Sequence, residues 1–585
     1  MFLRSHIRRK DGKDHRYWTI AESVRNGHRV FQRQVLYLGE LNDSQQKGWT
    51  HAINVLGEDG DERQMTLFPM DRTAPEGTVS PVHVNLAALT LSHQRQWGGC
   101  WLAMELWNRI GLDSFWRPLL PRSRKGINWL ALLKVLVTYR LVDPGSEWKC
   151  HREWLEKSAM RDLLGDDVLV GKSTLYNALD GLCEHSDKLF AFLRNRWCDM
   201  FGSRCDVVLY DLTSTYFECD GTKVERSALQ RHGYSRDKRG DCLQVVIALV
   251  LTPDGLPVAY EVLRGNTSDK ETQMQFLDRV EARHGKPGSI WLMDRGVPTE
   301  ETLLQMRERG AKYLVGTPRG RLSSLARELS GKPWEEVQHG IQVKCAERDG
   351  DTYVLTRSRD RCDKERAMRL RKMRRTIAGF RSVFDRKSPI DRDGLMMKLG
   401  ALKSECGLAW RFFNVRCPKA GEAVTRETFS WGINWDRVRQ ARNNEGTYLL
   451  RTNLSEENPR MLWRKYMLQG EVEQAFNEIK NDLGLRPVYH SNDERIKAHI
   501  FVSFLSFCLQ STLKNIAHAH ASGLTPRSII GKFKSIGMID VHIPTSDGRE
   551  LVLTRHVEPD RDVSLLLEQL DLKLPEQPPP RISAM

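Results

Sequence analysis

The sequence predicts an α+β multidomain protein. A mixed α/β core is interrupted by a β-rich insertion and preceded by a helical region and a small N-terminal β unit. Three observations support this. The 585 residues exceed what one hydrophobic core usually organises. The content of 40% apolar and 28% charged residues is that of a globular chain. The pattern also changes along the chain, from strand alternation to helical periodicity to short apolar runs.

The charge of the chain points to a polyanionic partner. Lys and Arg number 90 and Asp and Glu 75, which leaves a net charge of +15. Nucleic acid is the simplest such partner, and a basic protein without one is the plainer alternative. The longest apolar runs, 245–251 and 500–509, are shorter than the roughly 18–20 residues of a membrane span. We therefore expect an intracellular protein with no membrane partner.

Two common kinds of site are excluded by spacing. None of the 12 cysteines forms a Cys-x-x-Cys pair, so no zinc finger or secreted disulfide framework is predicted. Gly171-Lys172-Ser173 resembles the end of a phosphate-binding loop. That loop needs a glycine at position 166, where Asp166 stands, so an ATPase site is excluded.

Residues 1–68 predict a small basic β unit. Strand-like stretches at 17–24 and 29–38 flank Asn26-Gly27, a strong hairpin signal. Residues 69–84 contain prolines and glycine and predict a linker.

Residues 85–205 predict a helical region. Apolar residues recur at helical spacing, most clearly in 127–142 and 186–201. A DNA-binding bundle and a plain helical packing domain fit this periodicity equally well.

Residues 206–319 predict the first part of the mixed α/β core. Antiparallel pairing at its start is unlike a repeated βαβ fold. The expected order is strand 206–212, strand 243–251, strand 257–263, helix 270–281, strand 289–293, helix 300–309 and strand 312–316.

The remaining chain is predicted as three segments. Residues 320–456 form a β-rich insertion that also holds a basic helical run at 361–375. Helices return in 457–516 and complete the core. Residues 517–585 are an appendage with a hairpin about Asp547-Gly548.

Carboxylates follow apolar strands at two places. Asp211 and Asp294 each stand at the predicted end of a strand, where a pair of charges is costly unless a cation intervenes. A hard divalent ion such as Mg²⁺ prefers oxygen ligands of this kind. A third carboxylate could come from Glu471, Glu473 or Glu478, and helical periodicity does not decide among them.

Several motifs together resemble bacterial insertion-sequence transposases with a ribonuclease-H-like, Asp-Asp-Glu (DDE) catalytic domain. The resemblance covers residues 90–515 and the N-terminal hairpin. It implies that the mixed α/β core is ribonuclease-H-like and that the β-rich insertion precedes the last catalytic helix. The matching stretches are 210–218, 265–269, 293–296 (Met-Asp-Arg-Gly), 446–453, 471–480 and 485–490 (Leu-Arg-Pro-Val-Tyr-His).

The subgroup it resembles carries a Tyr-Arg-Glu-Lys signature with two, three and six intervening residues. Here Tyr466, Gln469, Glu473 and Lys480 stand at those spacings. The signature selects Glu473 as the third carboxylate. Gln469 replaces the arginine, so a hydrogen-bond donor remains while the charge is lost.

The resemblance implies a metal-dependent endonuclease and strand-transfer enzyme. Asp211, Asp294 and Glu473 would be the catalytic residues and would hold Mg²⁺, with Mn²⁺ as a substitute. Tyr466, Gln469 and Lys480 would contact DNA. The implied partners are double-stranded DNA, as transposon inverted repeats and target, and a second copy of the chain in the DNA complex.

Two alternatives stay open. One is a catalytically silent DNA-binding derivative, and the other is a ribonuclease-H-like nuclease without strand transfer. The expected location is the bacterial cytoplasm, in association with the nucleoid.

Overall fold

The computed structural model describes residues 2–10, 13–26, 29–40, 84–120, 127–165, 172–180, 182–203, 206–218, 227–267, 289–294, 299–317, 325, 329, 332–385, 390–454, 458–545 and 548–584. The predicted helix 270–281, and the predicted linker up to residue 83, lie outside them. The chain divides into two compact units. The first unit is Met1–Ser289 with Leu468–Met585, and the second unit is Ile290–Met467.

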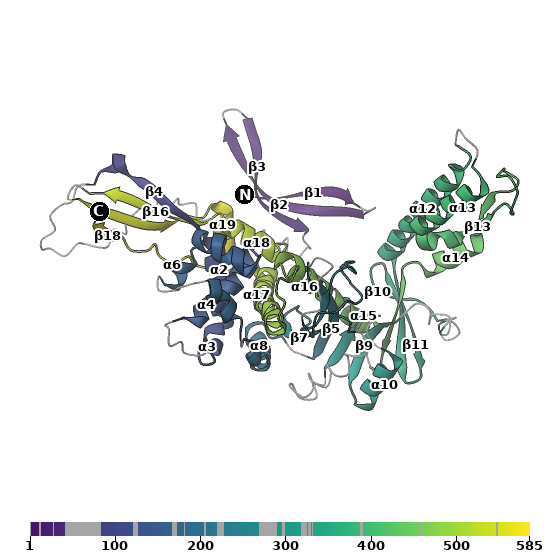
Figure 1. Cartoon of the computed structure of the whole chain (residues 1–585), viewed down its shortest axis with the longest axis horizontal. Helices are drawn as coiled ribbons and strands as arrows, with labels where there is room; N and C mark the ends of the chain where they lie inside the picture. Colours follow the sequence, from purple (N-terminus) through teal and green to yellow (C-terminus); the bar gives the residue numbers. More distant parts are fainter. Residues whose placement is uncertain are drawn as a thin grey trace. The chain divides into compact units, whose positions relative to one another are not determined.

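The described elements of the first unit alternate between strand and helix groups (Figure 1). They are β1 (Phe2–Lys10), β2 (Lys13–Asn26), β3 (Arg29–Glu40), η1 (Leu86–Ala88), β4 (Thr90–Gln96), α2 (Gly98–Ile110), α3 (Leu112–Trp116), α4 (Trp129–Val142), α5 (Glu147–Lys149), η2 (Cys150–Trp154), η3 (Leu155–Lys157), α6 (Met160–Leu164), α7 (Lys172–Ala178), η4 (Leu182–His185), α8 (Ser186–Phe201), β5 (Val207–Tyr216), β6 (Gln244–Leu251), β7 (Pro257–Arg264), α16 (Gln469–Asn477), η7 (Glu478–Asp482), α17 (Asp493–His520), α18 (Pro526–Phe533), β16 (Gly537–Pro544), β17 (Arg549–His556), α19 (Arg561–Gln569) and β18 (Arg581–Ala584).

The N-terminal strands form an antiparallel sheet in the order β1-β2-β3. The predicted hairpin about Asn26 is confirmed, because Asn26 of β2 pairs with Arg29 of β3. Ile20 and Leu36 also pair and are both buried. The strand β1 was not predicted, since its four Arg and Lys residues hide the alternation that marks a strand.

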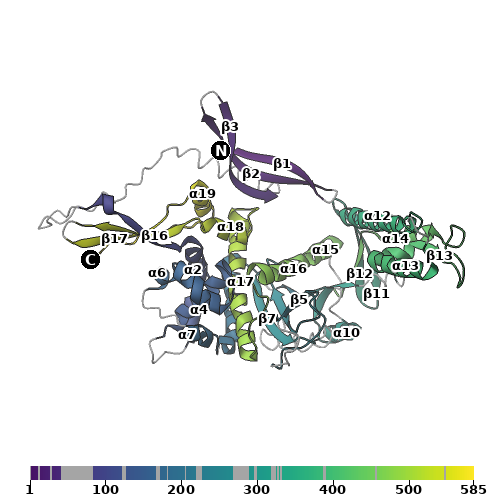
Figure 2. The ribbon, with the colours of Figure 1, turned by 45° about the horizontal axis from the view of Figure 1, so that its top comes forward.

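The helical region is built around α17. This helix runs beside α2 and α4 (Figures 1 and 2). Among the described residues it alone is long and apolar enough to cross a membrane, yet 94% of its apolar window is buried inside the structure. Burial of this kind is typical of a core helix. At its start, α2 comes so close to α18 that a Cβ on Gly98 would lie 2.2 Å from the Phe533 carbonyl oxygen.

The prediction that 85–205 is helical holds from Gly98 onward and is wrong before it. β4 is a strand that pairs with β16 in a four-stranded antiparallel sheet of order β18-β17-β16-β4. The predicted C-terminal hairpin is confirmed by the pairing of β16 with β17. Gly548 closes its turn with a φ of +79°, a conformation that favours glycine.

The core strands of the first unit are β5, β6 and β7, paired antiparallel in that order. All eight residues of β6 are buried, as expected for a strand covered on both faces. The predicted three-strand start of the core is therefore confirmed.

The second unit carries a mixed sheet with helices. Its elements are β8 (Ile290–Met293), α10 (Glu300–Glu308), β9 (Lys312–Thr317), β10 (Glu335–Gln338), β11 (Ile341–Arg348), β12 (Asp351–Ser358), α12 (Arg359–Arg381), α13 (Arg392–Cys406), η6 (Gly407–Phe412), β13 (Phe413–Arg416), β14 (Ser430–Ile433), α14 (Trp435–Asn444), β15 (Thr447–Thr452) and α15 (Pro459–Met467). β8 and β9 are parallel, and β9, β15, β12, β11 and β10 follow one another antiparallel.

The prediction of a β-rich insertion needs correction in its middle. Strands occupy its two ends, but α12 and α13 run for 23 and 15 residues, longer than any strand of the segment. α12, α13 and α14 gather beside β13 (Figure 2). They pack on a shared apolar cluster that includes Phe380, Leu399 and Val438. The predicted basic helical run is confirmed as the main part of α12.

Candidate active site

Asp211 stands in the middle of β5 rather than at a strand end. It is the fifth of ten residues, because Thr213, Ser214 and Thr215 continue the pairing with β6. Residues 207–215 are otherwise buried, and Asp211 alone among them is half-buried. Its Oδ1 accepts a hydrogen bond from the Leu212 N–H at 2.7 Å, which orients the carboxylate.

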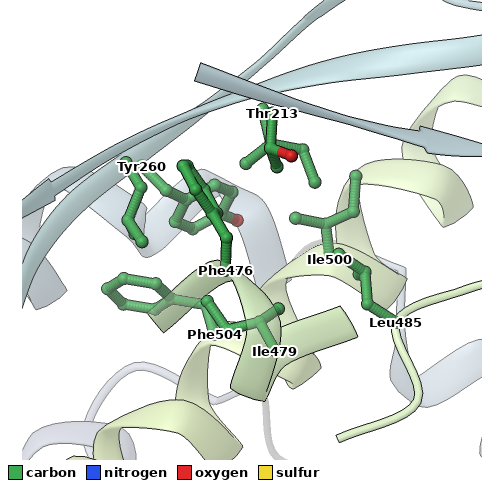
Figure 3. Close-up of a pocket in the computed structure, with 9 residues that line it drawn as sticks. Thr213, Tyr260, Phe476, Ile479, Leu485, Ile500 and Phe504 are labelled. Carbon is green, nitrogen blue, oxygen red and sulfur yellow. The ribbon is translucent and has the colours of Figure 1, made fainter. Parts of the chain in front are cut away.

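A small apolar cavity shows which elements cover the Asp211 face of the sheet. Side chains alternate along a strand, so Thr213 shares a face with Asp211. Leu249, the β6 residue paired with Asp211, also borders the cavity. Figure 3 shows Thr213 facing Phe476 and Ile479 from α16 and η7. The complete lining is Thr213, Ile247, Leu249, Tyr260, Phe476, Ile479, Leu485, Ile500 and Phe504.

α16 brings Glu473 to the elements that hold Asp211. The Nε2 group of Gln469, the first residue of α16, donates to the Tyr210 carbonyl oxygen at 3.5 Å. Glu473 lies one turn further along α16 and is exposed, whereas Val472 and Phe476 are buried. Asp211 and Glu473 therefore come from neighbouring elements of the first unit.

The helical segment from residue 459 to residue 482 is interrupted twice. α15 ends at Met467 and α16 begins at Gln469. From Glu478 to Asp482 the chain forms the π-helical turn η7, whose wider turns displace the residues that follow from a 3.6-residue periodicity. A regular α-helix would place Glu473 and Lys480, seven residues apart, on one face, but here Glu473 is exposed and Lys480 is buried.

The two other carboxylates of this segment have side-chain partners. Glu471 Oε2 forms an ion pair with Lys514 Nζ at 2.6 Å. Glu478 is buried and accepts hydrogen bonds from Gln474 at 2.7 Å and Gln510 at 3.2 Å. Burial raises the pKa of Glu478. Glu473 is left as the exposed carboxylate of α16, consistent with its choice by the signature.

Asp294 directly follows β8 and is half-buried, as the sequence predicted. It belongs to the second unit, whereas Asp211 and Glu473 belong to the first. We therefore treat a site formed by Asp211, Asp294 and Glu473 as a proposal.

Lys480 is held by a carboxylate that the sequence analysis missed. Its Nζ lies 2.9 Å from Oδ1 of Asp237, and Nη1 of Arg486 lies 2.7 Å from the same oxygen. Burial lowers the pKa of Lys480, and the hydrogen bond that Lys480 donates to Asp237 opposes this effect. Arg486 stands in the Leu-Arg-Pro motif and could have been noticed there. Asp237 has no local sequence signal.

Tyr466 lies on α15 in the second unit. Its ring stacks on Tyr448 of β15 with ring centroids 5.9 Å apart. The Tyr448 hydroxyl accepts a hydrogen bond from Trp463 at 2.6 Å, and the Arg361 guanidinium lies 5.3 Å from the Tyr448 ring centroid. Tyr466 therefore has a fixed aromatic support.

A second group of ionisable side chains is buried in the first unit. Ligand atoms of Glu147, His490 and His499 lie within 4.8 Å of one another. Arg140 shares this space: its Nη2 lies 3.3 Å from His499 Nδ1 and 3.7 Å from Glu147 Oε1. A guanidinium there disfavours a metal ion, so we regard the group as an ionic network that ties α4, α5 and α17 together. Burial lowers the pKa of His499 to about 4.

Comparison with known proteins identifies the family. A model described as "Transposase DDE domain" matches residues 214–509, half of the chain. Asp294, Glu473 and Lys480 lie inside this match, and Asp211 lies three residues before it. A second model, "IS1634 family transposase, N-terminal domain", matches residues 3–64.

Other comparisons add little. No curated protein matches the sequence. Among solved structures, a piggyBac transposase synaptic complex with hairpin DNA matches with 8% identity and a TM-score of 0.35, over 78% of this chain and 82% of that chain. A likeness of this size carries no argument. The two family models suffice to show that the chain belongs to the DDE-domain transposases, the DNA-cutting and strand-joining enzymes of insertion sequences.

Proposed function

We propose that Asp211, Asp294 and Glu473 are the catalytic carboxylates of this transposase, on a ribonuclease-H-like core. One observation carries the proposal: the first turn of α16 is bonded to the backbone beside Asp211. Exposed Glu473 belongs to the same helix, one turn after Gln469, which supports its inclusion in the proposed site. Asp294, at the end of β8, would complete the site.

The donor set fits a divalent ion, and we propose Mg²⁺, with Mn²⁺ as a substitute. Three carboxylates are hard oxygen ligands, the kind that Mg²⁺ prefers. Asp211 is half-buried and oriented by the Leu212 N–H. When bound, a pair of such ions supplies charge neutralisation at the phosphate and an activated attacking oxygen.

The remaining signature residues would engage DNA. Lys480 and Arg486 concentrate positive charge about one carboxylate, and a phosphate is the natural competitor for both. Gln469 is buried and bonded to Tyr210, so it would act through the position of α16. Tyr466 would contact the transposon end from its stack on Tyr448.

The partners we propose are the terminal inverted repeats and target DNA, bound by two copies of the chain because two ends must be joined. The proposed location is the bacterial cytoplasm at the nucleoid. A silent DNA-binding derivative and a nuclease without strand transfer are the competing functions.

A joining assay on DNA ends tests the proposal. We expect purified protein to cut and join inverted-repeat ends with Mg²⁺ and to lose both activities when a chelator is added. Asp211→Asn and Asp294→Asn should each abolish cleavage while end binding persists, since an amide keeps shape and loses the charge that holds the metal. Binding without cleavage by the wild type would indicate a silent derivative, and cleavage without joining a nuclease. Near-normal cleavage by either variant would remove that residue from the site.

A further inference from the structure

The positive charge of the chain is concentrated in one segment of the second unit. Residues 359–444 contain 22 Lys and Arg against 10 Asp and Glu, a net charge of +12 out of +15 for the whole chain. Within this segment α12 has ten basic and three acidic residues. From residue 366 to residue 381 it has seven basic residues and none that is acidic.

One side of α12 packs against other elements of the second unit. Cys362, Met373 and Phe380 are buried, the last two in the cluster shared with α13. Arg369 borders this side and pairs with Glu445 at 2.6 Å, with both side chains under 10% exposed. Arg361 pairs with Glu365 at 3.0 Å. These arginines have structural roles.

The opposite side of α12 is basic and open. Lys364 and Arg371 are seven residues apart, so they stand on one line about 10 Å apart, with exposed Arg374 beside them. Small Ala367 and Ala378 share this side and would let a large partner approach closely. Among the residues that the structure describes, no carboxylate lies within ion-pair distance of five exposed basic side chains here: Lys364, Arg371, Lys372, Arg374 and Arg381.

We propose that this basic side of α12 is a DNA-backbone binding surface that does not read sequence. The inference rests on the proposed function for the identity of the polyanion. Like charges at helical spacing repel one another, and solvated helices normally intersperse both signs. A row of fixed cations without counter-charges matches the phosphates of duplex DNA, which carry one negative charge per about 1.7 Å of axis.

Salt-dependent binding of the full-length protein tests the surface. The probes are a duplex with the inverted repeat and an unrelated duplex of equal length, between 50 and 200 mM salt. We expect K364A/R371A/R374A to weaken binding to both duplexes alike. The slope of log affinity against log salt should fall by about 2–3, since each lost phosphate contact removes about 0.9. The matched control K312A/K332A/R348A, also exposed and in the second unit, should keep the wild-type slope.

The outcomes separate the two proposals. A wild-type slope in the α12 variant, while the wild type binds, would overturn the surface and leave the proposed function standing. A wild type that binds neither duplex would overturn both. A loss confined to the inverted-repeat duplex would also overturn the surface, because it would indicate base reading. Should the triple variant fold poorly, K364E alone must weaken binding to both duplexes.

Discussion

The surroundings of η7 and the outer side of α12 are both rich in charge, yet they use it differently. Lys480 is buried and shares one oxygen of Asp237 with Arg486. Lys364 and Arg371 of α12 are exposed, and no carboxylate in the described part of the chain lies within ion-pair distance of them. A buried pair fixes the position of each group, because an unpaired charge there is costly. An exposed row gives attraction that acts over a distance and that salt weakens. A buried, fixed pair suits chemistry at one phosphate. An exposed row of cations suits the capture of a long polyanion.

The largest expected effect is a difference in cleavage activity between variants of two glutamates of α16. We expect Glu473→Gln to lower cleavage by about 100-fold or more, because even the loss of a residue that only orients a metal ligand costs ~10–100-fold. Glu471→Gln should lower it less than about threefold, since this half-exposed carboxylate pairs with Lys514 on the surface. Cleavage rates with saturating Mg²⁺ would measure both.

The reverse ranking would break the comparison. Full activity in the Glu473 variant and loss in the Glu471 variant would move the metal ligand to a residue already paired with Lys514. It would also overturn the match to the Tyr-Arg-Glu-Lys signature.

The next largest effect is a loss of stability when the buried Lys480–Asp237 pair is broken. We expect Lys480→Ala to lower the free energy of unfolding by about 3 kcal/mol, because Asp237 would keep its buried charge and lose the ammonium 2.9 Å away. Lys364→Ala on α12 should change it by less than about 0.5 kcal/mol. Urea denaturation would measure both, and K480A/D237A should lose less than the sum of its single variants. Equal small losses at both lysines would show that η7 is no more constrained than α12.

The smallest effect is a dependence of stability on pH. The pKa of His499 is about 4 in the folded protein and about 6.5 in the unfolded chain, so the unfolded state takes up the proton first. This contribution is complete above pH 6.5 and should fall by about 2 kcal/mol between pH 6.5 and pH 5, at about 1.4 kcal/mol per pH unit. The groups that face His499 are Arg140, Glu147 and His490.

Thermal unfolding at pH 7 and pH 5 would measure the effect. The wild type should lose stability between the two values, and His499→Gln should lose much less. Equal losses in both proteins would show that other groups govern the acid sensitivity.

Local sequence predicted much of the fold. The strands β5 to β9 and the C-terminal hairpin follow from short apolar runs and turn residues. Their limits were less predictable: β5 continues past Asp211 through Thr213, Ser214 and Thr215, which are polar but pair with β6. β4 was missed because its partner β16 is far away in sequence. The helices α13 and α14 of the insertion were missed because the short apolar stretches there lack a clear helix period.

The candidate site, too, could be predicted only in part from the sequence. The match to the family signature, rather than helical periodicity, selected Glu473 over Glu471, which pairs with Lys514 in the structure. The π-helical turn and the Asp237 partner of Lys480 could not be predicted. The first depends on hydrogen bonds in the folded helix, and the second joins residues 243 positions apart.

The pairing of β4 with β16 has a consequence for synthesis. β4 ends at Gln96 and its partner begins at Gly537. At about 5–20 residues per second, the ribosome needs roughly 20–90 s to make the intervening chain. During that time β4 has no partner strand. For most of it, α2 and α4 also lack the helix α17 that packs against them. The N-terminal sheet needs only residues within the first 40 and can form at once. A chain broken off before residue 493 would therefore keep this small basic sheet while lacking both β16 and α17.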